Sequence, residues 1–214
     1  MFLRILASIV SGYLLGSVMS AIIISNIVYR EDVRRHGSGN SGATNAARVY
    51  GAVIGLLTYL GDFLKGVLAC LLGRLIGGWT GDAAGVCLAC AGLAAVIGHS
   101  FPVFYRFKGG KGVATGSAFA LMLDWRIFVM AIAVFLVVAI LSKRVSAGSL
   151  AGCAAVAFGS IVFAKLPAQK ILGVLAALVV IAMHWQNISR LIKGEEKPFA
   201  FGKPRKPERP PRVK

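Results

Sequence analysis

Residues 113–141 read VATGSAFALMLDWRIFVMAIAVFLVVAIL, and this stretch decides the topology of the chain. A helix needs about 20 apolar residues to cross a hydrocarbon core that is about 30 Å thick. If the stretch formed one helix, Asp124 and Arg126 would lie near its middle, where each charge costs about 2.5–3.5 kcal/mol. We therefore predict that the chain reverses at Asp124-Trp125-Arg126, with a short helix over 113–123 and a longer one over 127–141.

The rest of the chain is equally apolar, since 57% of its 214 residues are hydrophobic. This composition excludes an ordinary soluble enzyme and a disordered nucleic-acid binder. Five further windows approach the length of a membrane span: 5–29, 51–77, 84–105, 147–164 and 167–186. The first window exceeds the roughly 15 apolar residues of a signal peptide, so we expect it to be retained. The sequence predicts an all-α integral membrane protein with about seven transmembrane helical segments, some of them short.

The charges indicate how these segments are oriented. The chain carries 24 Lys and Arg against 8 Asp and Glu, a formal net charge of +16. Four arginines lie within 30–48, after the first span, whereas only Arg4 precedes it. The positive-inside rule therefore places the N-terminus outside and the C-terminus in the cytoplasm. Lys165 and Lys170 fall on the outer side and do not fit this rule.

We divide the chain into a membrane-embedded domain, residues 1–197, and a basic tail, residues 198–214. The tail holds five of the seven prolines. Such a composition predicts a disordered cytoplasmic segment, which we expect to contact anionic lipid. Cys87 and Cys90 form a C-x-x-C pair inside an apolar run, and there we favour helix packing over a redox or metal role.

The first loop with a chemical signature is GSGNSGATN, residues 37–45. Its glycines let the backbone approach a ligand, and its hydroxyl and amide side chains supply neutral hydrogen-bond donors. Arg48 follows one helical turn after Asn45 and can serve as a counter-charge for an anion. The predicted contacts are Ser38, Gly39, Asn40, Thr44, Asn45 and Arg48. The plain alternative is a flexible connecting turn.

The second loop is FKGGKGVAT, residues 107–115, at the start of a predicted helix. Lysines interleaved with glycines form an anion cradle, to which we assign Lys108, Gly109, Gly110, Lys111 and Gly112. The loop lacks the spacing of a Walker A motif, so ATP hydrolysis is a poor interpretation. The alternative is that the lysines only satisfy the positive-inside rule.

The third cluster is HWQNISRLIKGEE, residues 184–196. His184, Asn187 and Arg190 are spaced by three residues and share one face of a continuing helix, with Glu196 close behind. Alone, the histidine would be read as an interfacial side chain. The shared face favours a functional site.

Two weaker features accompany the three loops. Asp62 and Lys65 lie inside the second span, where ionisable residues are suspected of function, although such a pair can also neutralise itself. Ser146 and Ser149 lie on the predicted cytoplasmic side, where their hydroxyl groups can contribute to a phosphate site.

Three anion-binding loops on one face of an apolar helical protein suggest a site for two partners. One is a water-soluble phosphate compound, and the other is a lipid whose acyl chain lies in a groove between helices. A transporter or channel for a small organic anion is the competing class. The interpretation as a membrane-bound scaffold or nucleic-acid binder is supported only by the basic tail, and we expect no nucleic-acid partner.

The three clusters together resemble the bacterial acyl-phosphate:glycerol-3-phosphate acyltransferases, the PlsY family. The resemblance rests on GSGNSGATN with Arg48, on GHSFPVFYRFKGGKGVAT at 98–115, and on H-x-x-N-I-x-R-L-x-x-G-x-E at 184–196. It implies transfer of an acyl group from acyl phosphate to glycerol 3-phosphate in phospholipid biosynthesis, yielding 1-acyl-glycerol 3-phosphate and phosphate. It also implies a multi-pass protein of the bacterial cytoplasmic membrane with the active site facing the cytoplasm. Trp185 departs from the basic or polar residue that is common there.

Such a reaction needs no cofactor, metal or covalent enzyme intermediate, because acyl phosphate is already activated. The resemblance implies catalytic roles for His184, Asn187, Ser38 and Lys108. The substrate-binding residues that we expect are Gly39, Asn40, Thr44, Asn45, Arg48, Gly109, Gly110, Lys111, Gly112, Ser146, Arg190 and Glu196. None of the three histidines begins the H-x-x-x-x-D signature of carrier-dependent acyltransferases. The proton acceptor is therefore left open between His184 and a substrate phosphate.

Overall fold

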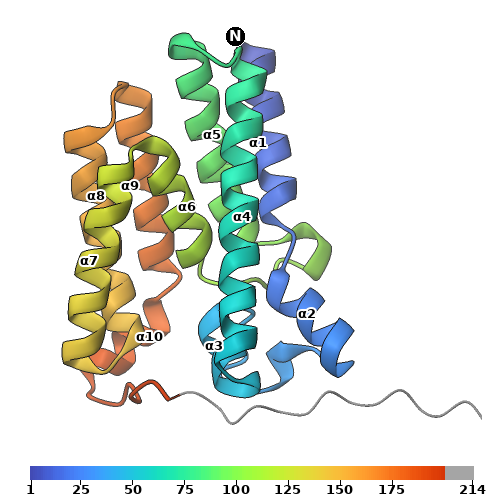
Figure 1. Ribbon diagram of the computed structural model, residues 1–214, viewed down its shortest axis with the longest axis vertical. Helices are drawn as coiled ribbons and strands as arrows, with labels where there is room; N and C mark the ends of the chain where they lie inside the picture. Colours follow the sequence, from blue (N-terminus) through green and yellow to red (C-terminus); the bar gives the residue numbers. More distant parts are fainter. Residues whose placement is uncertain (201–214) are drawn as a thin grey trace, which may run out of the picture.

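The computed structural model describes residues 1–200, and over that range it consists of helices and connecting loops (Figure 1). From residue 201 on, the tail that the sequence suggests lies outside the described residues. The α-helices are α1 (Phe2–Gly16), α2 (Ser20–Tyr29), α3 (Ala43–Tyr50), α4 (Ala52–Gly77), α5 (Gly81–Ser100), α6 (Val113–Leu123), α7 (Trp125–Ser142), α8 (Val145–Phe163), α9 (Pro167–Ala182) and α10 (Trp185–Ile192). Two 3-10 helices, η1 (Val33–Arg35) and η2 (Val103–Tyr105), lie in loops.

The reversal predicted within 113–141 is confirmed. Helix α6 ends at Leu123 and α7 begins at Trp125. The Asp124 carboxylate accepts the backbone N–H of Arg126 at 2.9 Å, which caps α7, and it also pairs with the Arg126 guanidinium at 2.9 Å. Because α7 has a mean hydropathy of 2.5 and is only 11% buried, it presents an apolar surface outward, as a helix facing lipid does.

Helices cover the predicted windows, but three windows are shorter or more broken than the sequence suggested. About seven membrane segments were predicted, whereas the described residues hold five helices long and apolar enough to cross a membrane, or up to six if α9 and α10 form one bent span. The window 5–29 was expected to be one helix, but the chain breaks between α1 and α2, where Lys65 Nζ donates to the carbonyl of Val18. The window 84–105 ends as α5 at Ser100, because Pro102 cannot continue a helix. The window 167–186 ends as α9 at Ala182, and the axis then bends by 59° into α10.

Small residues bring the helices close together. A Cβ on Gly12 of α1 would lie 2.4 Å from the carbonyl oxygen of Ala91 on α5, and one on Gly16 would lie 2.2 Å from that of Ala95. Gly73 of α4 meets the carbonyl oxygen of Cys87 on α5 in the same way. This close packing of backbones is typical of helices in membranes, and the cysteine takes part in it.

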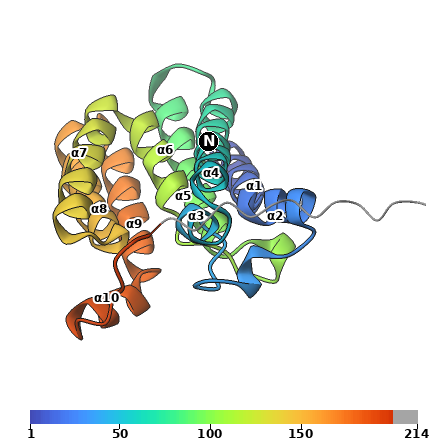
Figure 2. The same cartoon turned by 60° about the horizontal axis from the view of Figure 1, so that its bottom comes forward.

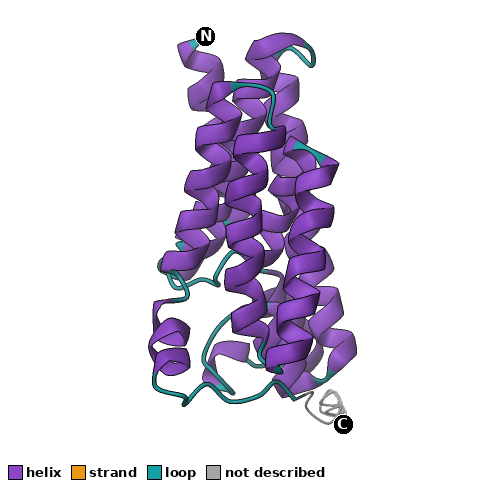
Figure 3. Cartoon of the chain, turned by 90° about the vertical axis from the view of Figure 1, so that its left-hand side faces the viewer, coloured by secondary structure: helices purple, strands orange, loops and turns teal. Residues whose placement is uncertain are grey.

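The loops carrying the three clusters lie in the half of the molecule away from the N-terminus, and the glycine loop lies nearer the middle than the other two (Figures 1 and 3). Helices α2, α3 and α10 lie at the end itself (Figure 2). Helix α6 starts at the glycine loop and lies between α4 and α5 on one side and α7 and α9 on the other (Figure 1). Its side chain Phe119 is 1% exposed and fills the space beside Gly92 of α5. The fold therefore brings distant segments of the chain around one space.

Candidate active site

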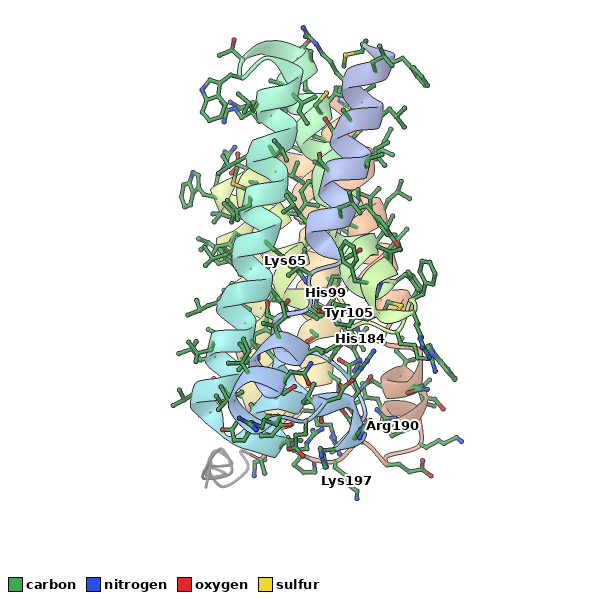
Figure 4. The ribbon with its side chains drawn as sticks, turned by 90° about the vertical axis from the view of Figure 1, so that its right-hand side faces the viewer. Lys65, His99, Tyr105, His184, Arg190 and Lys197 are labelled. Atoms are coloured by element: carbon green, nitrogen blue, oxygen red, sulfur yellow. The ribbon has the colours of Figure 1, made fainter. Side chains whose placement is uncertain are left out.

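A cavity of about 790 Å³ lies at the loop end and joins all three clusters. Most of the predicted site residues line it. They are Ser38, Gly39, Asn40, Thr44, Asn45, Arg48, Lys111, Gly112, Ser146, His184, Asn187, Arg190 and Glu196. Lys108, Gly109 and Gly110 do not line it. Figure 4 shows the depth of the site: Lys65 and His99 lie furthest into the helices, His184 is intermediate, and Arg190 and Lys197 are nearest the end.

Asn45 organises the first loop from within. Its Oδ1 accepts the backbone N–H of Ser38 at 2.8 Å, and its Nδ2 lies within 3.3 Å of the carbonyl oxygens of Val33, His36 and Asn40. The side chain is 2% exposed, so these bonds form without competition from water. Asn45 was expected to contact substrate; it lines the cavity, and its amide is already bonded to the loop backbone, so the residue shapes the loop.

The donors that remain for a ligand are the neighbours of Asn45. Within residues 1–200, the Ser38 and Thr44 hydroxyl groups and the Arg48 guanidinium have no side-chain hydrogen bond or ion pair. Ser38 and Thr44 lie beside the start of α3, where the first N–H groups of a helix lack intrahelical partners, and Arg48 follows Thr44 in the last turn of the same helix. This arrangement is suited to an anion.

The glycine loop places only part of its expected donors in the cavity. Lys108 is exposed, and its carbonyl oxygen, rather than its ammonium, is engaged, by Arg34 at 3.0 Å. Gly109 and Gly110 pack on His99 instead. Gly112 has φ +83° and begins α6, a conformation that favours glycine, and it delivers Lys111 into the cavity. The catalytic role expected for Lys108 therefore gains no support from its position.

Lys111 begins a chain of polar contacts that crosses the cavity wall. Its Nζ donates to Asn187 Oδ1 at 2.5 Å, and Asn187 Nδ2 donates to Glu196 Oε1 at 2.6 Å. The same carboxylate accepts Ser146 Oγ at 2.5 Å and Arg190 Nε at 2.6 Å. The Glu196 carboxylate thus bonds both Asn187 and Ser146. Together these contacts hold the two cations, Lys111 and Arg190, in place.

The charge of Lys111 is sensitive to pH. Burial disfavours its ammonium form and lowers the pKa of Lys111 to about 8, with Glu196 opposing the effect and Arg190 and Arg48 adding to it. An incoming phosphate would stabilise the ammonium. The cavity therefore holds several cations whose mutual repulsion an anion relieves.

His184 presents a nitrogen acceptor to the cavity. Its Nδ1 lies 2.7 Å from the carbonyl oxygen of Val180, which can only accept, so the proton resides on Nδ1. Nε2 then carries a lone pair, and within residues 1–200 it has no protein partner. The ring is 2% exposed, and the bend between α9 and α10 directs it into the cavity. Such a nitrogen can receive a hydroxyl hydrogen bond or a proton.

Two residues of the site were not predicted from the sequence: His99 and Tyr59 line the cavity beside Asp62. Ser149, which was expected together with Ser146, also lines the cavity. His99 lies within the second motif, but its importance depends on α4, which brings Lys65 to its ring. The pairing of positions 65 and 99 leaves no local signal in the sequence.

Comparison with known proteins agrees with this geometry. A family model described as glycerol-3-phosphate acyltransferase matches residues 6–194. The chain belongs to this family. It is 42% identical over 185 residues to a glycerol-3-phosphate acyltransferase of Finegoldia magna, covering 86% of this chain and 90% of the relative. It is 37% identical to one of Syntrophomonas wolfei, covering 89% and 94%.

Solved structures extend the comparison to three dimensions. The crystal structure of PlsY (YgiH), an integral membrane glycerol 3-phosphate acyltransferase, in its glycerol 3-phosphate form superposes with a TM-score of 0.83. The two share 31% identity over 92% of this chain and 96% of that one. The lysophosphatidic acid form of the same protein gives 0.80. This family member is therefore a multi-pass membrane protein built from apolar helices.

Proposed function

We propose that the chain transfers a fatty acyl group from acyl phosphate to glycerol 3-phosphate, releasing 1-acyl-glycerol 3-phosphate and inorganic phosphate, as a step of phospholipid biosynthesis. One observation carries the proposal: a single cavity holds two groups of phosphate donors and a histidine with a free acceptor nitrogen. Ser38, Thr44 and Arg48 form the first group, and Lys111 with Arg190 forms the second. Both substrates carry a phosphate, so each group has an occupant.

The chemistry follows from these positions. A hydroxyl oxygen of glycerol 3-phosphate attacks the acyl carbonyl carbon, and the bond from that carbon to the phosphate oxygen breaks. His184 Nε2 accepts the hydroxyl proton in our proposal, and the departing phosphate keeps the bonding electrons. Lys111 and Arg48 stabilise the negative charge that moves onto the phosphate. Holding both substrates in one cavity removes the entropic cost of their encounter.

The part of the acyl chain next to the carbonyl group is assigned to a small apolar groove beside the cavity. The groove measures about 60 Å³ and shares Val113, Phe135 and Ser149 with the cavity. Its other walls come from α6 to α9 and include Cys153 and Ala177. A polar cavity that continues into an apolar groove matches an amphiphilic donor, whose head and tail differ in the same way.

We further propose that the protein lies in the bacterial cytoplasmic membrane with the cavity at the cytoplasmic surface. The arginines at 30–48 lie at the cavity end, as the positive-inside rule requires for a cytoplasmic face. The N-terminus is then outside. Contact of the basic tail with anionic lipid belongs to the same proposal.

Purified protein in lipid nanodiscs tests the proposal. Phosphate release from palmitoyl phosphate should require glycerol 3-phosphate, and mass spectrometry should detect 1-palmitoyl-glycerol 3-phosphate. Palmitoyl-CoA in place of palmitoyl phosphate should give no product. Arg48→Ala and His184→Ala should each lower turnover at least about 100-fold, whereas Arg126→Ala, at the opposite end, serves as the control. Turnover with palmitoyl-CoA but not with palmitoyl phosphate would overturn the assignment, and so would anion flux without turnover.

A further inference from the structure

Three buried ionisable residues lie together at the inner end of the cavity, which two of them, Asp62 and His99, line. Lys65 and His99 lie deeper among the helices than His184 (Figure 4). Asp62 and Lys65 come from α4, and His99 comes from the end of α5. Their side chains are 1%, 7% and 3% exposed. Lys65 Nζ lies 2.9 Å from Asp62 Oδ1 and 3.0 Å from His99 Nδ1, and it also donates to the carbonyl oxygen of Val18. A buried cluster of this kind is costly unless every group has a partner.

The contacts of Lys65 determine which nitrogen of His99 carries the proton. Lys65 Nζ donates to the carbonyl oxygen of Val18 and forms an ion pair with Asp62, whose Oδ1 has no hydrogen bond among the described residues. An ammonium group has N–H donors and no acceptor. Because Nζ also lies 3.0 Å from Nδ1 of His99, that nitrogen must be the acceptor. The proton of the neutral His99 ring therefore resides on Nε2.

Nε2 of His99 faces the glycine loop at the floor of the cavity. A Cβ on Gly110 would lie 2.1 Å from this nitrogen, so only glycine at position 110 leaves it open. The Gly110 N–H donates to the main-chain carbonyl oxygen of His99 at 3.0 Å, which fixes the loop to the backbone of His99. His99 lines the cavity, and within residues 1–200 its Nε2 has no protein acceptor. A fixed donor is therefore left for a ligand.

The surroundings of this donor favour an anion. Gly112, Val113 and Ala114 line the cavity at the start of α6, where the first N–H groups lack intrahelical partners. Lys111 adds a positive charge beside them. The Asp62 charge is offset by Lys65 at 2.9 Å. An oxygen that only accepts hydrogen bonds, such as a phosphate oxygen, is complementary to this set.

We propose that the His99 Nε2–H group donates a hydrogen bond to a substrate phosphate oxygen, and that Lys65 is a positioning residue that selects this tautomer. The inference rests on the proposed function and adds a phosphate contact to it. His99 and His184 then have opposite tautomers, a donor at the floor of the cavity and an acceptor at its wall. The ionised Asp62–Lys65 pair serves to hold the donor form.

Steady-state kinetics test the contact and identify which phosphate it binds. His99→Leu should raise KM for either glycerol 3-phosphate or palmitoyl phosphate by about 10- to 100-fold, the effect of losing one hydrogen bond to a charged group. His99→Gln, whose amide NH2 can replace Nε2–H, should restore KM to within about fivefold of the wild type. Thr58→Val removes a buried hydroxyl from the same helix as Lys65 and serves as the control, with unchanged KM values and thermal melting.

The tautomer is measured directly on the wild-type protein with ¹⁵N-labelled histidine by NMR. We expect an Nε2–H signal for His99 that shifts when glycerol 3-phosphate or palmitoyl phosphate is added. In Lys65→Met, the ring proton should move to Nδ1, facing Asp62, and the phosphate KM should rise as in His99→Leu.

An Nδ1–H tautomer in the wild type, or unchanged KM values in a folded His99→Leu variant, would overturn the inference. The inference would also be overturned if KM rose equally in His99→Gln and His99→Leu while the two variants had equal melting temperatures. Absence of turnover in the wild type would instead refute the proposed function, because the NMR measurement does not depend on catalysis.

Discussion

The charge of Lys111 should set the alkaline limit of activity. Because burial lowers its pKa to about 8, the ammonium is present below that pH and is lost as the pH rises through it. A group with this pKa is about nine-tenths protonated at pH 7 and about one-tenth protonated at pH 9. Glycerol 3-phosphate is already a dianion over this range, since the second phosphate pKa is about 6. We therefore expect kcat/KM for glycerol 3-phosphate to fall about tenfold between pH 7 and pH 9.

The assay is initial-rate phosphate release from palmitoyl phosphate between pH 6 and pH 9.5, corrected for hydrolysis without enzyme. The kcat/KM profile reports the free enzyme, so its midpoint should lie near 8, whereas bound phosphate should move the midpoint of kcat upward. In Lys111→Arg, the guanidinium stays protonated, and any remaining activity should be independent of pH up to 9. A sloping profile in that variant, or a flat profile in the wild type, would refute the assignment of the charge to Lys111.

Three further predictions address the parts of the site that hold it in shape. Glu196→Gln replaces a carboxylate that accepts hydrogen bonds from Ser146, Asn187 and Arg190. The variant should have a kcat/KM lower by about tenfold or more and a reduced melting temperature. An unchanged melting temperature would contradict the role of Glu196 in holding these three side chains together. Asn45→Ala should remove the hydrogen bonds that shape residues 33–40 and lower the free energy of unfolding by about 2–3 kcal/mol. Denaturant unfolding measures this loss. Asn40→Ala removes one hydrogen bond of the loop and should lower the free energy of unfolding by less. Cys153→Phe fills part of the small apolar groove, so kcat/KM for palmitoyl phosphate should fall at least about fivefold. An unchanged kcat/KM in the folded variant would exclude the groove as the acyl site.

The helical segments were predictable because their signal is local. The charged pair at Asp124 and Arg126 is visible within one apolar stretch, and the structure places the reversal there. The break between α1 and α2 was not predictable in the same way. The window 5–29 is apolar throughout, and the carbonyl of Val18 that is freed at the break is satisfied by Lys65, which is 47 residues away.

Most residues of the three motifs line the cavity, as predicted, but the sequence did not reveal what each side chain does there. Lysines at 108 and 111 look equivalent in the sequence, yet only Lys111 lines the cavity. Asn45 and Asn187 were expected to meet substrate, and the structure shows that both amides are engaged by the protein. A motif identifies where polar groups gather. It does not reveal which of them are left free.

Composition and charge asymmetry determined by themselves that this protein is a helical membrane protein, and three motifs predicted an anion site on its basic face. Tertiary structure alone decided which donors remain open and which nitrogen of each histidine carries the proton. The physical reason is the range of the interactions. Hydropathy and charge act over one span and are written in consecutive residues, whereas Lys111 meets Asn187 across 76 positions and Lys65 meets His99 across 34. Only packed helices bring such pairs within hydrogen-bonding distance.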